Sequence, residues 1–213
     1  MMTDYQTEVA AALLKIEAVK LQPTAPFTWA SGILSLIYTD NRKTISFPAV
    51  RRLIAQGLAA LIKREYPDVQ VIGGVATAGI PHAAWVAEVL DLPMVYVRSK
   101  PKDHGAGQQI EGVVLPGQKV VLIDDLISTG GSVLGAVKAT RAAGAEVLGV
   151  SAIFSYELPA ATQNFGEAQT PFNALTNYTT LLTVAQQTGA IQASDLATLQ
   201  EWRQDPQAWQ PNN

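Results

Sequence analysis

The chain has 213 residues, of which 48% are hydrophobic and 15% are charged, and its formal net charge is −3 at pH 7. This length favours a single globular domain, and the composition excludes a disordered chain. The weakly acidic balance argues against a nucleic-acid partner, because such proteins need a strongly basic surface. There is no cysteine and there are only two histidines, which excludes thiol catalysis, cysteine-ligated zinc and a histidine-rich metal site.

The sequence shows no sign of export or of a membrane anchor. The N-terminal segment MMTDYQTEVA lacks the basic start and the continuous apolar stretch of a signal peptide. The longest apolar runs, such as 120–123 and 148–154, fall far short of the ~20 residues that a membrane-spanning helix needs. We therefore expect a cytoplasmic protein that has no membrane partner.

The first part of the chain predicts a helix, a lobe of short elements and a second helix. Apolar residues near helical spacing predict the first helix within residues 4–20. Residues 23–48 mix proline, glycine and serine with short aromatic and β-branched runs, so we expect loops and short strands in a small separate lobe. From Pro48 to Ile62 an apolar stripe at i, i+3 and i+4 predicts the second helix.

The middle of the chain alternates between predicted strands and helices. The strands are expected at 69–73, 93–98, 119–123 and 147–154, and the helices at about 81–90 and 131–143. This alternation is typical of an α/β fold with a parallel sheet. Beyond Tyr156, residues 157–171 show no period, whereas 178–188 and 194–203 fit surface helices.

The segment VVLIDDLISTGGS at 120–132 carries the strongest chemical signal. A buried strand is followed by Asp124 and Asp125 and then by a turn, 128–132, that leads into a helix. The amides of such a turn and the helix N-terminus favour a phosphate dianion. No lysine follows the glycines, so this is not the GxxxxGK[ST] loop of nucleoside-triphosphate sites. The carboxylates would repel a phosphate, so we assign them to the vicinal hydroxyls of a ribose. The alternative is a purely structural strand, turn and capped helix.

Two further loops are candidates for binding a polyanion. Arg98, Lys100, Lys102 and His104 place four potential cations within seven positions, beside glycines at 105 and 107. In an acidic protein, such a loop indicates a lid that closes over a diphosphate, although a solvated charged loop is the alternative. The glycine- and alanine-rich turn at 77–80 offers backbone amides to a diphosphate. His82, next to this turn, is expected to be a structural residue.

The run VVLIDDLISTGGS resembles the phosphoribosyl-diphosphate (PRPP) signature of type I phosphoribosyltransferases. Four further segments resemble the orotate phosphoribosyltransferase family in the same order, namely ASGILSLIYTDNR (30–42), GGVATAGIPHA (73–83), YVRSKPKDHGAGQQIEG (96–112) and IFSYEL (153–158). The resemblance implies the type I phosphoribosyltransferase fold over 1–213, with a central parallel sheet flanked by helices. It also implies a small N-terminal hood from about 20–47, to which C-terminal segments contribute.

The resemblance implies a set of site residues. Catalytic roles are implied for Lys102, Asp124, Asp125, Arg98 and His104. PRPP binding is implied for these five residues and for Lys100, Leu126, Ile127, Ser128, Thr129, Gly130, Gly131, Ser132, Thr77, Ala78 and Gly79. Mg²⁺ is expected as the cofactor, held mainly by PRPP and not directly by the protein. A homodimer is implied in which the basic loop reaches into the partner's site.

For the base, Ser128, Tyr38 and Tyr156 are the expected orotate contacts, with the Tyr38 ring stacking on the pyrimidine. The alternative for Tyr38 is an ordinary core aromatic.

The hood segment departs from the family pattern. Leu34 and Leu36 stand where lysine and proline are expected, and Ala30 stands where some members have a lysine. Tyr156 replaces the arginine that some members place near the orotate carboxylate. Arg42, Lys43 and backbone amides are the other candidates for that carboxylate.

The implied reaction transfers the phosphoribosyl group from PRPP to orotate and gives orotidine 5'-phosphate and pyrophosphate, in pyrimidine (UMP) biosynthesis. One alternative is a type I transferase for a purine or for uracil, which should lack the RSKPKDHG lid and the hood. The other is a non-enzymatic regulator that senses a ribose phosphate, and such a protein usually adds a basic nucleic-acid-binding surface.

Overall fold

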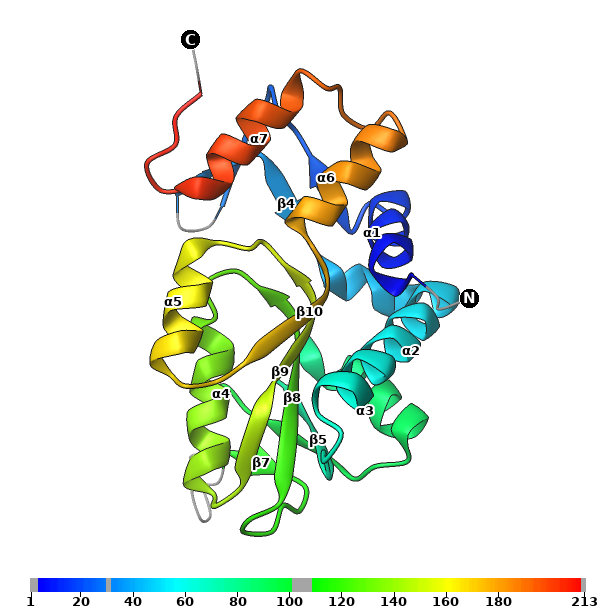
Figure 1. The fold of residues 1–213 in the computed structure, drawn as a ribbon, viewed down its shortest axis with the longest axis vertical. Helices are drawn as coiled ribbons and strands as arrows, with labels where there is room; N and C mark the ends of the chain where they lie inside the picture. Colours follow the sequence, from blue (N-terminus) through cyan, green and yellow to red (C-terminus); the bar gives the residue numbers. More distant parts are fainter. Residues whose placement is uncertain (1–3, 30–31, 101–108, 212–213) are drawn as a thin grey trace.

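The computed structural model describes residues 4–29, 32–100 and 109–211. Its centre is a six-stranded sheet in the order β10-β9-β8-β5-β6-β7 (Figure 1). Five strands are parallel, and only the short edge strand β7 runs antiparallel. The strands are β5 (Val71–Val75), β6 (Met94–Val97), β7 (Ile110–Glu111), β8 (Lys119–Ile127), β9 (Glu146–Ser155) and β10 (Phe172–Asn177).

Helices cover both faces of this sheet (Figure 1). On one face lie α1 (Tyr5–Lys15), α2 (Pro48–Glu65) and α3 (Gly79–Leu90), and on the other lie α4 (Gly131–Ala142) and α5 (Pro159–Glu167). Alternate residues of a strand point to opposite faces. Accordingly, Val121 and Ile123 pack in the core under the first group, whereas Val120 and Leu122 pack under α4 and α5. Burial on both sides explains why this strand is a continuous apolar run.

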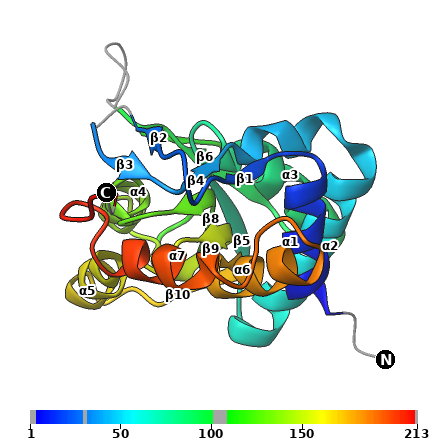
Figure 2. The same ribbon diagram turned by 90° about the horizontal axis from the view of Figure 1, so that it is seen from above.

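A group of small elements lies above the carboxyl ends of the strands (Figures 1 and 2). We call these elements the hood: β1 (Val19–Leu21), β2 (Phe27–Thr28), β3 (Leu34–Ser35), β4 (Ile37–Thr39), α6 (Tyr178–Gln187) and α7 (Asp195–Gln204). The strands form two antiparallel pairs, β1–β4 and β2–β3. The fully buried Trp202 of α7 donates a hydrogen bond of 2.9 Å from Nε1 to the carbonyl oxygen of Leu34. The hood is therefore built from both ends of the chain.

The predicted order of elements from Pro48 to Ser155 is confirmed, as are the two C-terminal helices. The first helix is shorter than the predicted 4–20. It begins behind Asp4, whose side chain accepts a hydrogen bond from the Thr7 amide, and it ends at Lys15. Glu17 then adopts a left-handed backbone (φ 55°), which turns the chain into β1.

Three elements were not predicted: the short strand β7, helix α5 in the stretch 157–171 for which no period was found, and strand β10 directly after that stretch. Helix α5 begins with a proline in its first turn and buries only Ala161 and Phe165, which is too few apolar residues to show a helical period. Strand β10 adds a sixth strand to the sheet and pairs in parallel with β9. Sequence periodicity misses such elements when their contacts come from distant parts of the chain.

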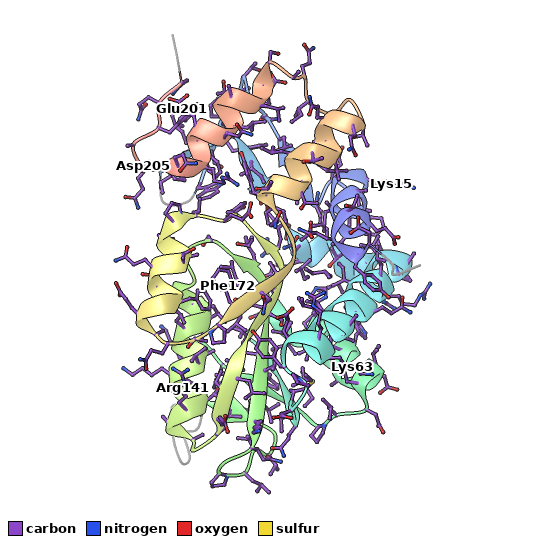
Figure 3. All side chains as sticks on the ribbon, in the orientation of Figure 1. Lys15, Lys63, Arg141, Phe172, Glu201 and Asp205 are labelled. Carbon is purple, nitrogen blue, oxygen red and sulfur yellow. The ribbon has the colours of Figure 1, made fainter. Side chains whose placement is uncertain are left out.

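Charged side chains lie on the outer faces of the helices. Figure 3 shows the labelled charged residues Lys15, Lys63, Glu201 and Asp205 on outer positions of the helices and the chain that follows α7, and all four are exposed. The labelled Phe172 instead packs inward on Phe165, with ring centroids 4.3 Å apart. Among the helices of the described ranges, none has both the length and the apolar character required to cross a bilayer.

Candidate active site

The candidate site lies at the crevice between the carboxyl ends of β5 and β8. Strand β5 is followed along the chain by its neighbour β6, and β8 is added on the other side of β5, so the strand order reverses between β5 and β8. Ligands of open α/β sheets bind at such a switch point. The turn after β5 lies against β8, because a Cβ atom on Gly79 would come within 2.2 Å of the Ile123 carbonyl oxygen. Only glycine fits this approach.

The acidic pair lies inside strand β8, which corrects the expectation that the strand ends before it. The pairing of β8 with β5 stops at Ile123, whereas its pairing with β9 continues to Ile127. Asp124 and Asp125 therefore follow the point at which β8 loses one neighbour, beside the crevice. The extra strand length was not visible because polar residues in a strand interrupt the apolar run that marks it.

The two carboxylates are poorly solvated. Asp124 is 9% exposed, and burial, assisted by the negative charge of Asp125, raises the pKa of Asp124 to about 7. Burial also raises the pKa of Asp125. An ionised carboxylate can accept several hydrogen bonds, and burial disfavours its charge, so hydroxyl donors that enter the crevice are favoured partners.

The turn at 128–132 has the geometry of an anion site. Gly130 adopts φ +83° immediately before α4, and a Cβ atom there would lie 2.5 Å from the Phe165 ring. The side chain of Asn164 donates a hydrogen bond of 2.9 Å to the carbonyl oxygen of Thr129 and braces the turn. The turn leads directly into the N-terminus of α4, where unpaired amides and the helix dipole favour an anion.

The other predicted PRPP contacts on this segment differ in their access. Thr129, Gly131 and Ser132 are exposed and Ser128 is half-buried. The side chain of Ile127 is fully buried in the core beneath α4, and that of Leu126 packs against the opposite core, so these two residues can offer only their main chain.

A cavity of about 240 Å³ lies beside this turn, between the ends of β5 and β6 and the start of α4. It is lined by Ala76, Arg98, Ser99, Gln109, Gly131 and Ser132, among others. The preceding turn continues through Thr77 and Ala78 after a cis peptide bond between Ala76 and Thr77. The glycine-rich turn after β5 and the turn at 128–132 after β8 thus border the same cavity.

The basic loop enters this cavity with Arg98. Reciprocal hydrogen bonds of 2.8 Å join its main chain to Gln109, one between backbones and one from the Gln109 side chain. The Arg98 guanidinium lies 3.7 Å from the Glu111 carboxylate, and Lys100 is exposed. The other two predicted cations of this loop, Lys102 and His104, lie outside the described residues.

The aromatic residues of the hood differ in exposure. Tyr38 is 43% exposed and lies beside Phe27, with ring centroids 5.6 Å apart. The alternative that Tyr38 is a core aromatic is therefore wrong, and its stacking on a base stays a prediction. Tyr156 is buried and stacks on Trp29 at 5.5 Å, and burial raises the pKa of its hydroxyl to about 12. Its contact with orotate also stays a prediction.

The structure shows where the residues that depart from the family pattern lie and what they contact. Leu36 is fully buried in the core below the hood, and Leu34 is half-buried, with its carbonyl oxygen bound to Trp202. Arg42 pairs with Asp40 through a hydrogen bond of 2.6 Å, and Lys43 donates to the carbonyl oxygen of Glu17 at 3.0 Å. Both candidate cations for the orotate carboxylate therefore have partners. Ala30 lies outside the described residues.

Sequence reasoning gave no role to Asn41, which the structure brings to the acidic pair. Its side-chain amide donates a hydrogen bond of 2.7 Å to the carbonyl oxygen of Asp125. An asparagine next to an arginine carries no signal by itself, because its contact with Asp125 joins positions 84 residues apart.

His82 is buried, as expected of a structural histidine, and burial lowers its pKa to about 4.

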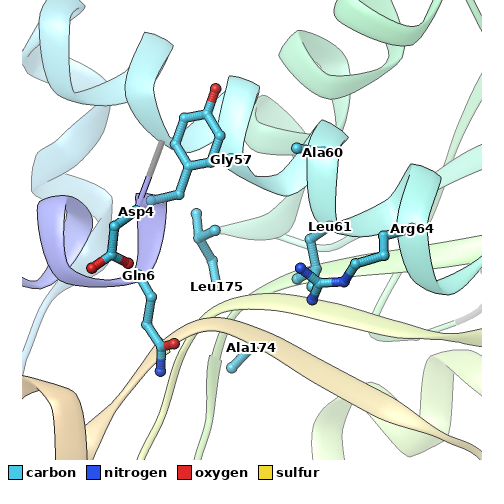
Figure 4. Close-up of a pocket in the computed structure, with 9 residues that line it drawn as sticks. Asp4, Gln6, Gly57, Ala60, Leu61, Arg64, Ala174 and Leu175 are labelled. Atoms are coloured by element: carbon cyan, nitrogen blue, oxygen red, sulfur yellow. The ribbon is translucent and has the colours of Figure 1, made fainter. Parts of the chain in front are cut away.

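A second hollow, of about 350 Å³, lies between α1, α2 and β10 (Figure 4). Its floor is formed by Gly57, Leu61 and Leu175, and Asp4 and Arg64 stand at its rim. Arg64 is already paired with Glu65 at 2.7 Å. None of the predicted site residues that the structure describes lines this hollow, so we place the active site at the β5–β8 crevice.

Comparisons with known proteins show the family of the chain. The phosphoribosyl transferase domain family matches residues 41–162, which contain the crevice and both turns. The orotate phosphoribosyltransferase of Lactiplantibacillus plantarum is 64% identical over 98% of this chain and 98% of its own. That of Bacillus caldolyticus is 56% identical over 95% of this chain and 98% of its own.

Solved structures show the same fold. The UMP synthase of Leishmania donovani superposes with a TM-score of 0.79 at 29% identity, covering 92% of this chain and 42% of that protein. The orotate phosphoribosyltransferase of Aeropyrum pernix superposes with a TM-score of 0.70 at 25% identity, covering 85% of this chain and 99% of that one. With a central parallel sheet, a switch-point site and near full-length relatives of one name, the chain belongs to the orotate phosphoribosyltransferase family.

Proposed function

We propose that this protein transfers the phosphoribosyl group from PRPP to orotate and releases pyrophosphate, in the synthesis of UMP. The observation that carries the proposal is the junction at the β5–β8 crevice, where Gly79 approaches the carbonyl oxygen next to Asp124. One strand, β8, provides an acidic pair for a ribose and leads into an anion-binding turn for its phosphate. The relatives at 56–64% identity indicate that the acceptor is orotate, because they are orotate phosphoribosyltransferases by name.

The leaving group undergoes the largest charge change in this reaction. Loss of pyrophosphate from the anomeric carbon builds an oxocarbenium-like transition state, so cations must stabilise the departing diphosphate and carboxylates the sugar. We assign the first task to Arg98, Lys102 and His104 and the second to Asp124 and Asp125. Orotate is already anionic, and the N1 proton that is lost as N1 bonds to the anomeric carbon can pass to solvent, so a dedicated general base is optional. The half-buried position of Arg98 in the cavity beside the phosphate turn supports this division.

Mg²⁺ fits the site as a cation held mainly by PRPP. Over 4–29, 32–100 and 109–211, no three His, Cys, Asp or Glu side chains gather as a metal-binding group. The acidic pair alone gives too few ligands for a protein cage, whereas magnesium sites often use substrate phosphates and waters. When bound, Mg²⁺ would neutralise charge on the diphosphate.

We also propose that the chain forms one phosphoribosyltransferase domain and acts in the cytoplasm. We propose further that it is a homodimer with shared sites, in which the basic loop of one subunit closes the site of the other.

Mixing inactive Lys102→Ala protein with inactive Asp125→Asn protein tests whether the sites are shared. If sites are shared, random exchange of subunits should restore about a quarter of the wild-type activity, because half of the dimers would have one intact site. No recovery after verified exchange, or full activity of a monomer by light scattering, would contradict shared sites. Fractionation of cells that express the tagged chain tests the location.

The function itself is tested by following the absorbance of orotate with PRPP and Mg²⁺. Loss of orotate that depends on PRPP is the expected result. Turnover of hypoxanthine or uracil without turnover of orotate would identify another type I transferase. Binding of PRPP without turnover of any base would identify a regulator.

A further inference from the structure

Asn41 occupies a position between the hood and the acidic pair. It begins the 3-10 helix η1 (Asn41–Ser46), which directly follows the hood strand β4 and precedes α2. The side chain is 1% exposed, and its Nδ2 atom donates to the carbonyl oxygen of Asp125 at 2.7 Å. The β5–β8 pairing ends at Ile123, so the amide supports β8 beyond the point where β5 can.

The main chain of Asn41 is held in turn by the buried Thr44, which also contacts the buried His82. The Thr44 hydroxyl donates a hydrogen bond of 2.5 Å to the carbonyl oxygen of Asn41, and its oxygen lies 3.3 Å from Nε2 of His82. A hydroxyl has a single proton, and this one is used by Asn41, so the Thr44 oxygen must accept from His82. His82 is therefore the neutral Nε2–H tautomer, which agrees with its lowered pKa.

The inner end of this chain of contacts reaches the diphosphate turn. His82 lies in the first turn of α3, which begins at Gly79 directly after Thr77 and Ala78. Contacts from His82 through Thr44 and Asn41 therefore join the start of α3 to the main chain of Asp125. The turn that we assign to the diphosphate and the strand that we assign to the ribose are thus connected below the crevice.

We propose that Asn41 is a positioning residue that fixes the main chain at Asp125, and that Thr44 and His82 hold Asn41 in place. The proposal rests on the proposed function in one respect, the assignment of Asp124 and Asp125 to PRPP. Its consequence is that the acidic pair keeps a fixed distance from the diphosphate turn. The ribose and the leaving group are then held in one geometry.

A contribution to folding alone accounts poorly for this residue. The Oδ1 atom of Asn41 is buried and has no hydrogen-bond partner among the described residues, and Nδ1 of His82 is in the same condition. Buried polar atoms without partners lower stability by about 1–3 kcal/mol each. Leucine would remove the unpaired Oδ1 atom but would also remove the donor to the Asp125 carbonyl oxygen, so the contact with β8 is what the amide supplies and an apolar side chain cannot.

The first test compares Asn41→Leu with Asn173→Leu. Asn173 also donates a side-chain hydrogen bond, of 3.1 Å to the Tyr66 hydroxyl, but on β10 away from the crevice. We expect Asn41→Leu to weaken the binding of PRPP with Mg²⁺ in calorimetry and to lower kcat, each by roughly 10- to 100-fold. The KM for orotate should stay nearly unchanged. Asn173→Leu should change only the melting temperature. Wild-type kcat and PRPP affinity in folded Asn41→Leu protein would overturn the proposal.

A second pair of variants decides the question if Asn41→Leu does not fold. Thr44→Val removes the hydroxyl and keeps the shape, whereas Thr44→Ser keeps the hydroxyl. We expect Thr44→Val to weaken PRPP binding in the same direction as Asn41→Leu, and Thr44→Ser to restore it. Equal PRPP binding by the valine and serine variants would overturn the role of Thr44 and His82.

The tautomer of His82 gives a spectroscopic readout. In ¹⁵N NMR the ring should show the Nε2–H form in wild type, and the signal is simple to assign because the chain has two histidines. An Nδ1–H form would contradict the chain of contacts. If wild type binds PRPP but does not consume orotate, the proposed function fails, whereas the PRPP affinities of the variants still decide this inference.

Discussion

The backbone amide of Asp125 donates a hydrogen bond of 2.9 Å to Oδ1 of Asp124. This contact fixes the Asp124 side chain against the strand and favours its charged form. Burial and the neighbouring Asp125 charge outweigh this effect, and the pKa of Asp124 is raised to about 7. Near neutral pH Asp124 therefore exchanges between its protonated and charged forms, and the charged form lowers the stability of the fold.

Replacing Asp124 with asparagine should raise stability and reduce activity. Between about pH 4 and pH 7 the folded protein binds a proton at Asp124 that the unfolded chain does not bind, so this residue lowers stability as pH rises through that window. Asp124→Asn should therefore melt higher than wild type at pH 8, and the gain should shrink toward pH 4. The turnover of PRPP should fall because a ribose contact is lost. Glu88→Gln, at an exposed position on α3, should leave both profiles unchanged; a lower melting temperature for Asp124→Asn at pH 8 would contradict the prediction.

Gly130→Ala should damage the phosphate turn. The residue adopts φ +83°, and its new Cβ atom would meet the Phe165 ring at 2.5 Å. We expect a loss of stability of about 1–3 kcal/mol and a higher KM for PRPP. Gly166→Ala is the matched control, because a Cβ atom there has open space and the backbone needs no positive φ. Equal denaturant midpoints for the two variants would argue against a strained turn.

Lys102→Ala tests the lid. If Lys102 stabilises the departing diphosphate, kcat should fall by about 100-fold or more, whereas the melting temperature should not change. Lys63→Ala removes a lysine at an exposed position of α2 (Figure 3) and should leave kcat at the wild-type value. Full activity of Lys102→Ala would refute the assignment of this loop.

Trp202→Phe tests the connection between α7 and the hood. Phenylalanine keeps most of the packing but cannot donate to the carbonyl oxygen of Leu34, so we expect a loss of about 1–2 kcal/mol and a higher KM for orotate. Trp209→Phe is the control, because the buried Nε1 of Trp209 has no partner among the described residues. Its removal should not lower stability. An unchanged orotate KM in Trp202→Phe would show that α7 does not support the base site.

The local structure of the segment 120–132 could be predicted from the sequence because its signals lie close together, whereas its binding of PRPP stays a prediction. The strand, the acidic pair, the phosphate turn and the start of α4 lie within residues 120–132, and the glycines at 79 and 130 stand where a close approach and a positive φ require them. The length of β8 could not be predicted, since it depends on where the partner strands β5 and β9 end.

The hood and its support could be predicted only in outline. The contact of Trp202 with Leu34 joins residues 168 positions apart, and that of Asn41 with Asp125 joins residues 84 apart. No pattern in a single segment reports such a contact. Leu36 shows the same limit, because its departure from the family pattern is understood only once its complete burial is known.

The contact between Leu34 and Trp202 can form only late in the synthesis of the chain. The matched family domain ends at residue 162, whereas Trp202 leaves the ribosome about 40 residues later, after the strands β5, β8 and β9 have been made. The hood, to which we assign the base, is therefore among the last parts of the protein to be completed. In a product that ends before Trp202, the Trp29 and Tyr156 rings would lose their contacts with the Trp202 ring. Such an exposed apolar surface would mark truncated chains for proteolysis.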